Sequence, residues 1–225
     1  MTLRRWLSAL ALLGITLGSG IAVAVPAQAA TARQPILFVH GYDSNGSTWN
    51  TMVANFTAAG YTSAELFAIS YNTRQSNATT AAELAGIVTD IQASSGWATI
   101  DVISHSMGGL SSRYYLRNLG GTAAIDEWVS LGGPNHGTKT ARFCFDTSCR
   151  EMRPQSPFLT GLNTGDETPG TVRYGTWASP CDIVILPNNS VPLTGARNTR
   201  TACLGHSDPQ NDATVFGQVL TFVVG

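Results

Sequence analysis

The sequence has little charge and almost no lysine. Only 12% of its 225 residues are charged, and Lys139 is the one lysine among 13 basic residues. The formal net charge of −1 and the lack of a long basic run exclude the positively charged patch of a nucleic-acid-binding protein. The 43% hydrophobic content is typical of a globular core and argues against disorder. The length fits one domain, and the 23 glycines indicate many tight turns.

Long apolar runs are absent after residue 25, and the run before it has the order of a secretory signal peptide. Two arginines precede an apolar stretch at 6–25, and an A-x-A cleavage sequence follows at 27–29. A membrane anchor is the alternative, since the stretch approaches the ~20 residues that span a bilayer. We predict a signal peptide at 1–29 and a secreted, extracellular chain at 30–225, with no membrane span and net charge −3 from 11 basic and 14 acidic residues.

The sequence has no C-x-x-C motif and no histidine at metal-ligand spacing from its four cysteines. In an oxidising compartment an even number of cysteines favours two disulfides, and four cysteines allow three pairings. The short spacing of Cys144 and Cys149 favours a local bridge, which leaves Cys181 to pair with Cys203. A zinc site is the alternative that the missing ligand spacing disfavours. We therefore expect neither a metal nor another cofactor.

The pattern of apolar residues alternates between that of strands and that of helices. Strands are predicted at 36–39, 65–70, 99–103, 127–131 and 172–176, and helices at 47–59, 79–93, 107–118 and from about 208 onwards. The stretch 138–170 has no clear period and is predicted to be a loop. Such alternation predicts an α/β fold, a mostly parallel sheet with helices on both faces. Its active site would lie at the carboxyl ends of the strands.

A nucleophilic serine is predicted between the third strand and the helix that follows it. Residues 104–108 read SHSMG, close to the G-x-S-x-G pattern in which a tight turn exposes the serine, here Ser106. The helix start would stabilise a developing oxyanion, with the Met107 N–H as one donor. The Tyr42 N–H, in the loop after the first strand, is the expected second donor. The alternative is a buried strand–helix junction with a capping serine.

The general base is predicted by chain order. A serine nucleophile needs a histidine, and in this fold the order is serine, acid, histidine. Only His136 and His206 follow Ser106, and the acids between Ser106 and His136 lie at the opposite end of a strand. His206 is therefore the predicted base. His40 and His105 are expected to be structural, with His105 facing away from the site.

Asp182 is the leading candidate for the acid that orients His206. It follows Cys181 directly, and Cys203 lies three residues before His206, so a bridge between these cysteines would bring the two loops together. Asp146, Asp166 and Asp208 remain alternatives for the acid, although Asp208 fits the start of the last helix better.

Three blocks together resemble the small secreted bacterial triacylglycerol lipases of the class 2 family, within the α/β-hydrolase superfamily. They are FVHG at 38–41, SHSMGG at 104–109 and LGGPNHGT at 131–138. The resemblance extends from about residue 34 to the end of the chain. It implies a minimal α/β-hydrolase fold with little or no lid.

By the same resemblance Ser106, Asp182 and His206 form the triad, and Tyr42 and Met107 line the oxyanion hole. Ser104 stands where the family often has alanine or glycine, and the cysteine-bearing insert at 143–157 exceeds the shortest members.

The expected activity is hydrolysis of fatty-acid esters through an acyl-enzyme intermediate, by a monomer acting at a lipid–water interface. A short-chain carboxylesterase is the alternative on the same site, and a peptidase is a further one. A non-catalytic secreted binding module on a hydrolase scaffold is the alternative from another class. Such a module would have no need of an intact triad.

Overall fold

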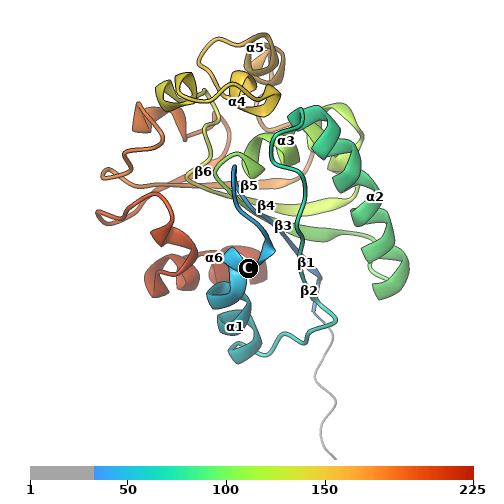
Figure 1. Cartoon of the computed structure of the whole chain (residues 1–225). Coiled ribbons are helices and arrows are strands. Elements are labelled where there is room, and N and C mark those ends of the chain that lie inside the picture. The colour runs from blue at the N-terminus through green and yellow to red at the C-terminus, as the bar shows by residue number, and fades with distance from the viewer. Residues whose placement is uncertain (1–32) are drawn as a thin grey trace, which may run out of the picture. The chain divides into compact units, whose positions relative to one another are not determined.

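A six-stranded parallel sheet organises residues 33–225, the part of the chain that the computed structural model describes (Figure 1). The predicted signal peptide at 1–29 lies outside the described residues. The strand order is β2-β1-β3-β4-β5-β6, and every neighbouring pair is parallel. The strands are β1 (Ile36–Val39), β2 (Leu66–Ala68), β3 (Ile100–His105), β4 (Ile125–Leu131), β5 (Arg173–Ala178) and β6 (Arg197–Arg200).

Helices cover both faces of the sheet, as the alternating pattern predicts (Figure 1). They are α1 (Asn50–Ala58), α2 (Asn77–Ser95), α3 (Gly108–Asn118), α4 (Thr147–Glu151), α5 (Pro157–Asn163) and α6 (Ala213–Val224). Helix α2 begins at the cap Ser76, whose side chain accepts from the Ala78 N–H, and ends at Gly96 in the left-handed conformation. Within the described residues, no helix has both the length and the apolar character needed to cross a bilayer.

Two apolar cores follow from the alternation of side chains along each strand. In β1, Leu37 and Val39 pack with the apolar residues of α2 and α3, whereas Ile36 and Phe38 pack with those of α1 and α6. All four side chains are fully buried. A strand that is buried on both faces reads as a continuous apolar run, which is why 36–39 could be predicted without an alternating pattern.

Three sequence expectations about the elements were wrong. The stretch 138–170, expected to be a loop, contains α4 and α5. These helices have only five and seven residues, too short for a 3.6-residue period to emerge. The last helix begins at Ala213 rather than near 208, because Asp212 caps it by accepting from the Val215 N–H, while Asp208–Gln210 forms a separate 3-10 turn. Strand β6 has polar, mostly exposed residues at the sheet edge and was missed.

A buried carboxyl group lies near the amino end of the sheet. Asp101 Oδ1 accepts from Gln34 Nε2 at 3.1 Å and from the Glu127 N–H at 3.2 Å, while Oδ2 has no partner among residues 33–225. Burial, together with the neighbouring Glu127 carboxyl, raises the pKa of Asp101 well above its usual value. The folded state therefore binds this proton more tightly than the unfolded state does. Stability is lost as the pH rises above the ordinary aspartate pKa of about 3.9.

Replacing Asp101 with asparagine is expected to stabilise the fold at pH 8, because asparagine keeps the accepting oxygen and removes the buried charge. We expect the free energy of unfolding to rise by about 1–3 kcal/mol at pH 8, because each unit by which folding raises the pKa of a carboxyl costs about 1.4 kcal/mol above the raised pKa, and to change little below pH 4. Urea unfolding at both pH values measures the effect. Asp126 is exposed and directly precedes Glu127 in the chain. Asp126→Asn is therefore the matched control, and it should change the free energy of unfolding by under ~0.5 kcal/mol. A less stable Asp101→Asn chain at pH 8 would contradict the assignment.

Candidate active site

Ser106 lies on a tight turn that joins β3 to α3. Its φ of 52° is in the left-handed region, which residues other than glycine rarely adopt. The turn leaves no room for side chains beside it. A Cβ on Gly41 would lie 2.8 Å from the Ser106 Cβ, and one on Gly108 would lie 2.4 Å from the Val39 carbonyl oxygen. The small residues of the SHSMG run therefore allow the strained turn that the sequence predicted.

The three residues predicted as a triad come from three separate loops and meet in one hydrogen-bonded chain. His206 Nε2 lies 2.9 Å from Ser106 Oγ, and His206 Nδ1 lies 2.7 Å from Asp182 Oδ2. Since a carboxylate only accepts, Nδ1 carries the ring proton and Nε2 is free to accept from the serine hydroxyl. The arrangement can remove a proton from Ser106.

The second carboxylate oxygen of Asp182 is also hydrogen-bonded. Oδ1 accepts from the Val184 N–H at 2.7 Å and from the Ile185 N–H at 2.9 Å. Burial on its own would raise the pKa of Asp182, but the hydrogen bond from His206 and those from the two backbone N–H groups hold it below its usual value. The acid is therefore kept ionised and fixed in orientation.

The three alternative acids are each engaged elsewhere. Asp146 accepts from the Tyr42 hydroxyl and pairs with Arg74. Asp166 accepts from the Thr168 N–H, and Asp208 accepts from the Gly205 N–H. Within residues 33–225, Asp182 is the one carboxylate bonded to His206.

Two links join the acid loop to the histidine loop. The predicted Cys181–Cys203 bridge is present, with Cα atoms 4.9 Å apart, as is the local Cys144–Cys149 bridge, with Cα atoms 5.8 Å apart. Ser179 supplies the second link, because its hydroxyl donates to the Leu204 carbonyl at 2.6 Å and accepts from the Leu204 N–H at 2.9 Å. Sequence analysis missed Ser179, since no spacing distinguishes it from other loop serines.

Removing the bridge between the two loops is expected to cost more stability than removing the local one. The Cys181–Cys203 bridge spans 22 residues and the Cys144–Cys149 bridge spans 5. In the chain-entropy description these separations correspond to about 3 and about 2 kcal/mol. Paired cysteine-to-serine variants, compared by chemical denaturation, measure the difference. Equal losses, or a larger loss for the local bridge, would contradict this order.

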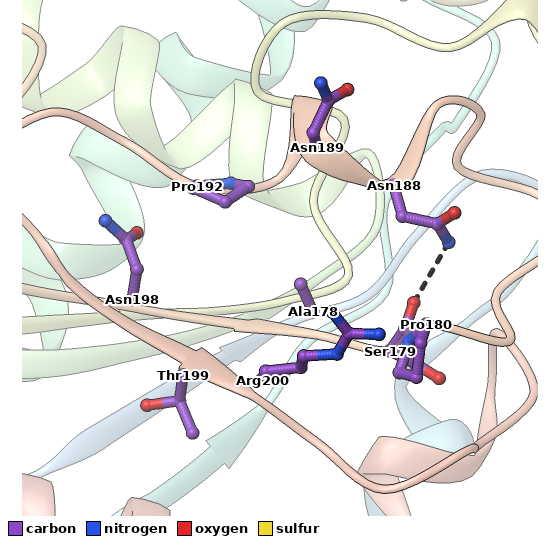
Figure 2. A pocket seen from close by; sticks show the side chains of 9 residues that line it. All are labelled: Ala178, Ser179, Pro180, Asn188, Asn189, Pro192, Asn198, Thr199 and Arg200. Carbon is purple, nitrogen blue, oxygen red and sulfur yellow. Dashed lines mark hydrogen bonds between the residues drawn. The ribbon is translucent and has the colours of Figure 1, made fainter.

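Asn188 holds the backbone of the loop that carries Asp182. Its side-chain amide donates to the Ser179 carbonyl at 2.9 Å and to the Asp182 carbonyl at 2.8 Å. Figure 2 shows the first of these bonds at the wall of an open cavity of about 390 Å³ beside β5 and β6. None of the three triad residues lines this cavity. Asn188 was also missed, because its partners are backbone atoms that leave no mark in the sequence.

Tyr42 and Met107 lie beside Ser106, where the sequence predicts two oxyanion donors. Tyr42 lines a cavity of about 250 Å³ together with Ser106 and His206, and Met107 directly follows Ser106. Within residues 33–225, neither backbone N–H donates to a protein acceptor. Both groups are therefore free to bind an oxygen of a substrate.

The remaining three histidines contact protein groups other than Ser106, but one of them faces the site. His40 is fully buried, bonds the Gly41 carbonyl at 2.9 Å and stacks on Tyr71, as expected of a structural histidine. His136 pairs with Glu167 instead of with the serine. The expectation that His105 faces away is wrong.

His105 packs against the triad histidine, with ring centroids 4.7 Å apart. Its Nε2 donates to the His206 carbonyl at 2.9 Å. Burial, and then the nearby His206, lower the pKa of His105 to about 3, so the ring is neutral near pH 7. The wrong expectation arose because the direction of a side chain at a turn depends on the loop that packs above it.

Comparison with known proteins identifies the family and the fold of the chain. Residues 33–201 match the family described as lipase (class 2). The chain is similar to a lipase of Bacillus licheniformis in its mature form, with 19% identity, a TM-score of 0.75, and 86% of this chain and 93% of that one covered. It is also similar to lipase B of Aspergillus fumigatus, with 16% identity and a TM-score of 0.76, over 86% of this chain and 53% of that one.

These matches confirm the minimal α/β-hydrolase fold that the sequence predicts. The chain belongs to the class 2 lipase family. It is a carboxylic ester hydrolase of the lipolytic kind, so its substrates are lipids or other esters. The two disulfides are compatible with secretion.

Proposed function

We propose that the protein is a secreted serine hydrolase that cleaves fatty-acid esters, triacylglycerols among them, through a Ser106–His206–Asp182 triad. The observation that carries the proposal is the unbroken hydrogen-bond chain from Ser106 Oγ through His206 to Asp182, with Ser106 in a strained left-handed turn. A capping serine at a buried strand–helix junction would need neither the strain nor the histidine.

In the first half of the reaction, His206 Nε2 takes the proton of Ser106 as its oxygen attacks the ester carbonyl. Asp182 holds the ring in the required tautomer and stabilises the imidazolium that forms. The tetrahedral intermediate then collapses, the imidazolium gives its proton to the departing alkoxide, and an acyl-enzyme with a free alcohol results. Water attacks the acyl-enzyme by the same route, which releases the fatty acid and restores the serine.

The Tyr42 and Met107 N–H groups are proposed to hold the oxyanion of each tetrahedral intermediate. Their lack of protein acceptors and the start of α3 just after Ser106 support this role. One such donor is worth roughly 3–4 kcal/mol of barrier.

The apolar lining of the cavity beside Ser106 is suited to an acyl chain. Its walls include four apolar residues, Ala141, Met152, Val184 and Ile185. Its volume of about 250 Å³ lies below the ~300–1,000 Å³ range of typical ligand sites. This size favours a second candidate function, hydrolysis of short-chain esters on the same site. We further propose that residues 1–29 direct secretion and that the mature chain acts as a monomer.

Reaction with a fluorophosphonate probe tests the nucleophile. We expect the probe to label the protein once, on the peptide that contains Ser106, because the triad activates this serine alone. Intact-mass and peptide mass spectrometry measure the labelling. Absence of labelling, or labelling of another serine, would contradict the proposal. Turnover of emulsified triacylglycerols against short acyl esters then separates the lipase from the short-chain esterase.

A further inference from the structure

The most exposed large apolar side chains of the described residues lie in two loops next to the active site. Phe143 is 86% exposed, Phe145 71% and Ile183 76%. The other exposed large apolar residues of the described part of the chain are less exposed, at 38% for Val184, 42% for Leu119 and 56% for Val224. Phenylalanines of this exposure are costly in water unless another surface covers them.

Hydrogen bonds join these two loops into one rim around the mouth of the Ser106 cavity. Thr140 Oγ1 donates to the Val184 carbonyl at 2.6 Å, and the Lys139 N–H donates to the Leu186 carbonyl at 2.8 Å. The cavity itself is lined by close neighbours of the exposed side chains in the chain, namely Ala141, Cys144 and Val184. A surface that covers the exposed side chains would therefore meet the entrance to the active site.

The backbone of the turn that carries Phe143 and Phe145 is held in place by a disulfide and by an arginine. The Cys144–Cys149 bridge closes the turn that carries Phe145. Arg153 fastens the same turn, because its Nε donates to the Ala141 carbonyl at 3.0 Å and its Nη2 to the Cys144 carbonyl at 2.9 Å.

The same rim has free positive charge, although the whole chain has a net charge of −1. Lys139, Arg142 and Arg150 are exposed, and within residues 33–225 none of them forms an ion pair. The two acids of the insert are already engaged. Asp146 pairs with Arg74, and Glu151 accepts from Ser76 and Asn77.

We propose that Phe143, Phe145 and Ile183, with the cations Lys139, Arg142 and Arg150, form a docking rim for an anionic lipid bilayer. The apolar side chains enter the boundary between headgroups and acyl chains, while the cations bind the anionic headgroups. This inference rests on the proposed function in one respect, that the ester delivered to the rim is cleaved at Ser106. It adds which residues meet the lipid surface and the negative charge that this surface carries.

Vesicle binding by the Ser106→Ala chain tests the rim without any need for catalysis. We expect this chain to sediment with phosphatidylglycerol vesicles at least about tenfold more strongly than with phosphatidylcholine vesicles, and less strongly as salt is added. In the same background, Phe143→Ser with Phe145→Ser should weaken binding to phosphatidylglycerol about tenfold or more. Arg142→Gln with Arg150→Gln should weaken it and reduce its dependence on salt.

Matched controls are available near the amino ends of the parallel strands, away from the active site. Leu119→Ser removes an exposed apolar side chain at the end of α3, and Arg197→Gln removes an exposed cation at the start of β6. Both should bind vesicles as the parent does. Equal binding to the two lipids, or undiminished binding by the phenylalanine variant, would overturn the proposal. So would sedimentation of the free chain as a dimer that the phenylalanine variant abolishes, because the rim would then bind a second copy. The proposed function is tested separately, because the fluorophosphonate probe reports on Ser106 whether or not the rim binds vesicles.

Discussion

Replacing Ser106 with alanine is expected to lower kcat on a chromogenic acyl ester by roughly four to six orders of magnitude. The loss is large because the serine, histidine and acid work as one unit. Without the Oγ that lies 2.9 Å from His206 Nε2, no acyl-enzyme can form. The residual rate would come from the oxyanion donors and substrate binding alone. Initial rates at saturating ester, with enzyme purified free of host esterases, measure the effect.

Ser104→Ala is the matched control for this change. Ser104 lies two residues before the nucleophile and is fully buried, and its hydroxyl donates to the Val129 carbonyl at 2.7 Å. Losing that bond should cost about 1 kcal/mol of stability and change kcat no more than a few-fold. A Ser106→Ala chain that keeps activity within tenfold of the parent would remove Ser106 from the mechanism.

Replacing Asp182 with asparagine is the second large effect, with kcat expected to fall by about three to four orders of magnitude near neutral pH. Asparagine can keep the bonds from the Val184 and Ile185 N–H groups on its oxygen. Its amide then donates to His206 Nδ1, which moves the ring proton to Nε2. In that tautomer the histidine cannot accept the proton of Ser106.

Binding should be preserved in the Asp182→Asn chain, so the change is expected in kcat and much less in KM. Asp208→Asn is the control, because Asp208 lies two residues from His206 in the chain, but among residues 33–225 its carboxylate accepts only from the Gly205 N–H. Its kcat should stay within a few-fold of the parent. A comparable loss in both variants would show that the loop, rather than the acid, had been disturbed.

Most of the fold could be predicted because its central elements are specified locally. The run at 36–39 is fully buried, and the stripe of α2 faces one core, so each leaves a clear apolar pattern. The missed elements are those without such a pattern. Strand β6 is held by backbone bonds to β5 and exposes its side chains. Helix α4 has five residues and α5 has seven, so neither exceeds about two turns.

The juxtaposition of the proposed triad residues could be predicted wherever chain order or cysteine spacing limited the choice. Ser106 and His206 followed from the motif and the order of the triad, and Asp182 from its position beside Cys181. The contacts of Ser179 and Asn188 could not be predicted, because both residues bond to backbone atoms of distant loops. The direction of His105 was unpredictable for the same reason, since its partner is the carbonyl of His206.

The bridge between Cys181 and Cys203 also bears on when the enzyme becomes competent. The nucleophile turn joins β3 to α3, packs against β1 and β4, and contains no cysteine, so it needs no oxidation to form. The acid and the histidine lie 24 residues apart on loops whose one covalent tie is that bridge. In a chain whose cysteines are reduced, the turn that carries Ser106 would therefore form, while the loops that carry Asp182 and His206 would lack their covalent link. Oxidation of this cysteine pair would therefore strengthen the assembly of the triad without being needed for the nucleophile turn.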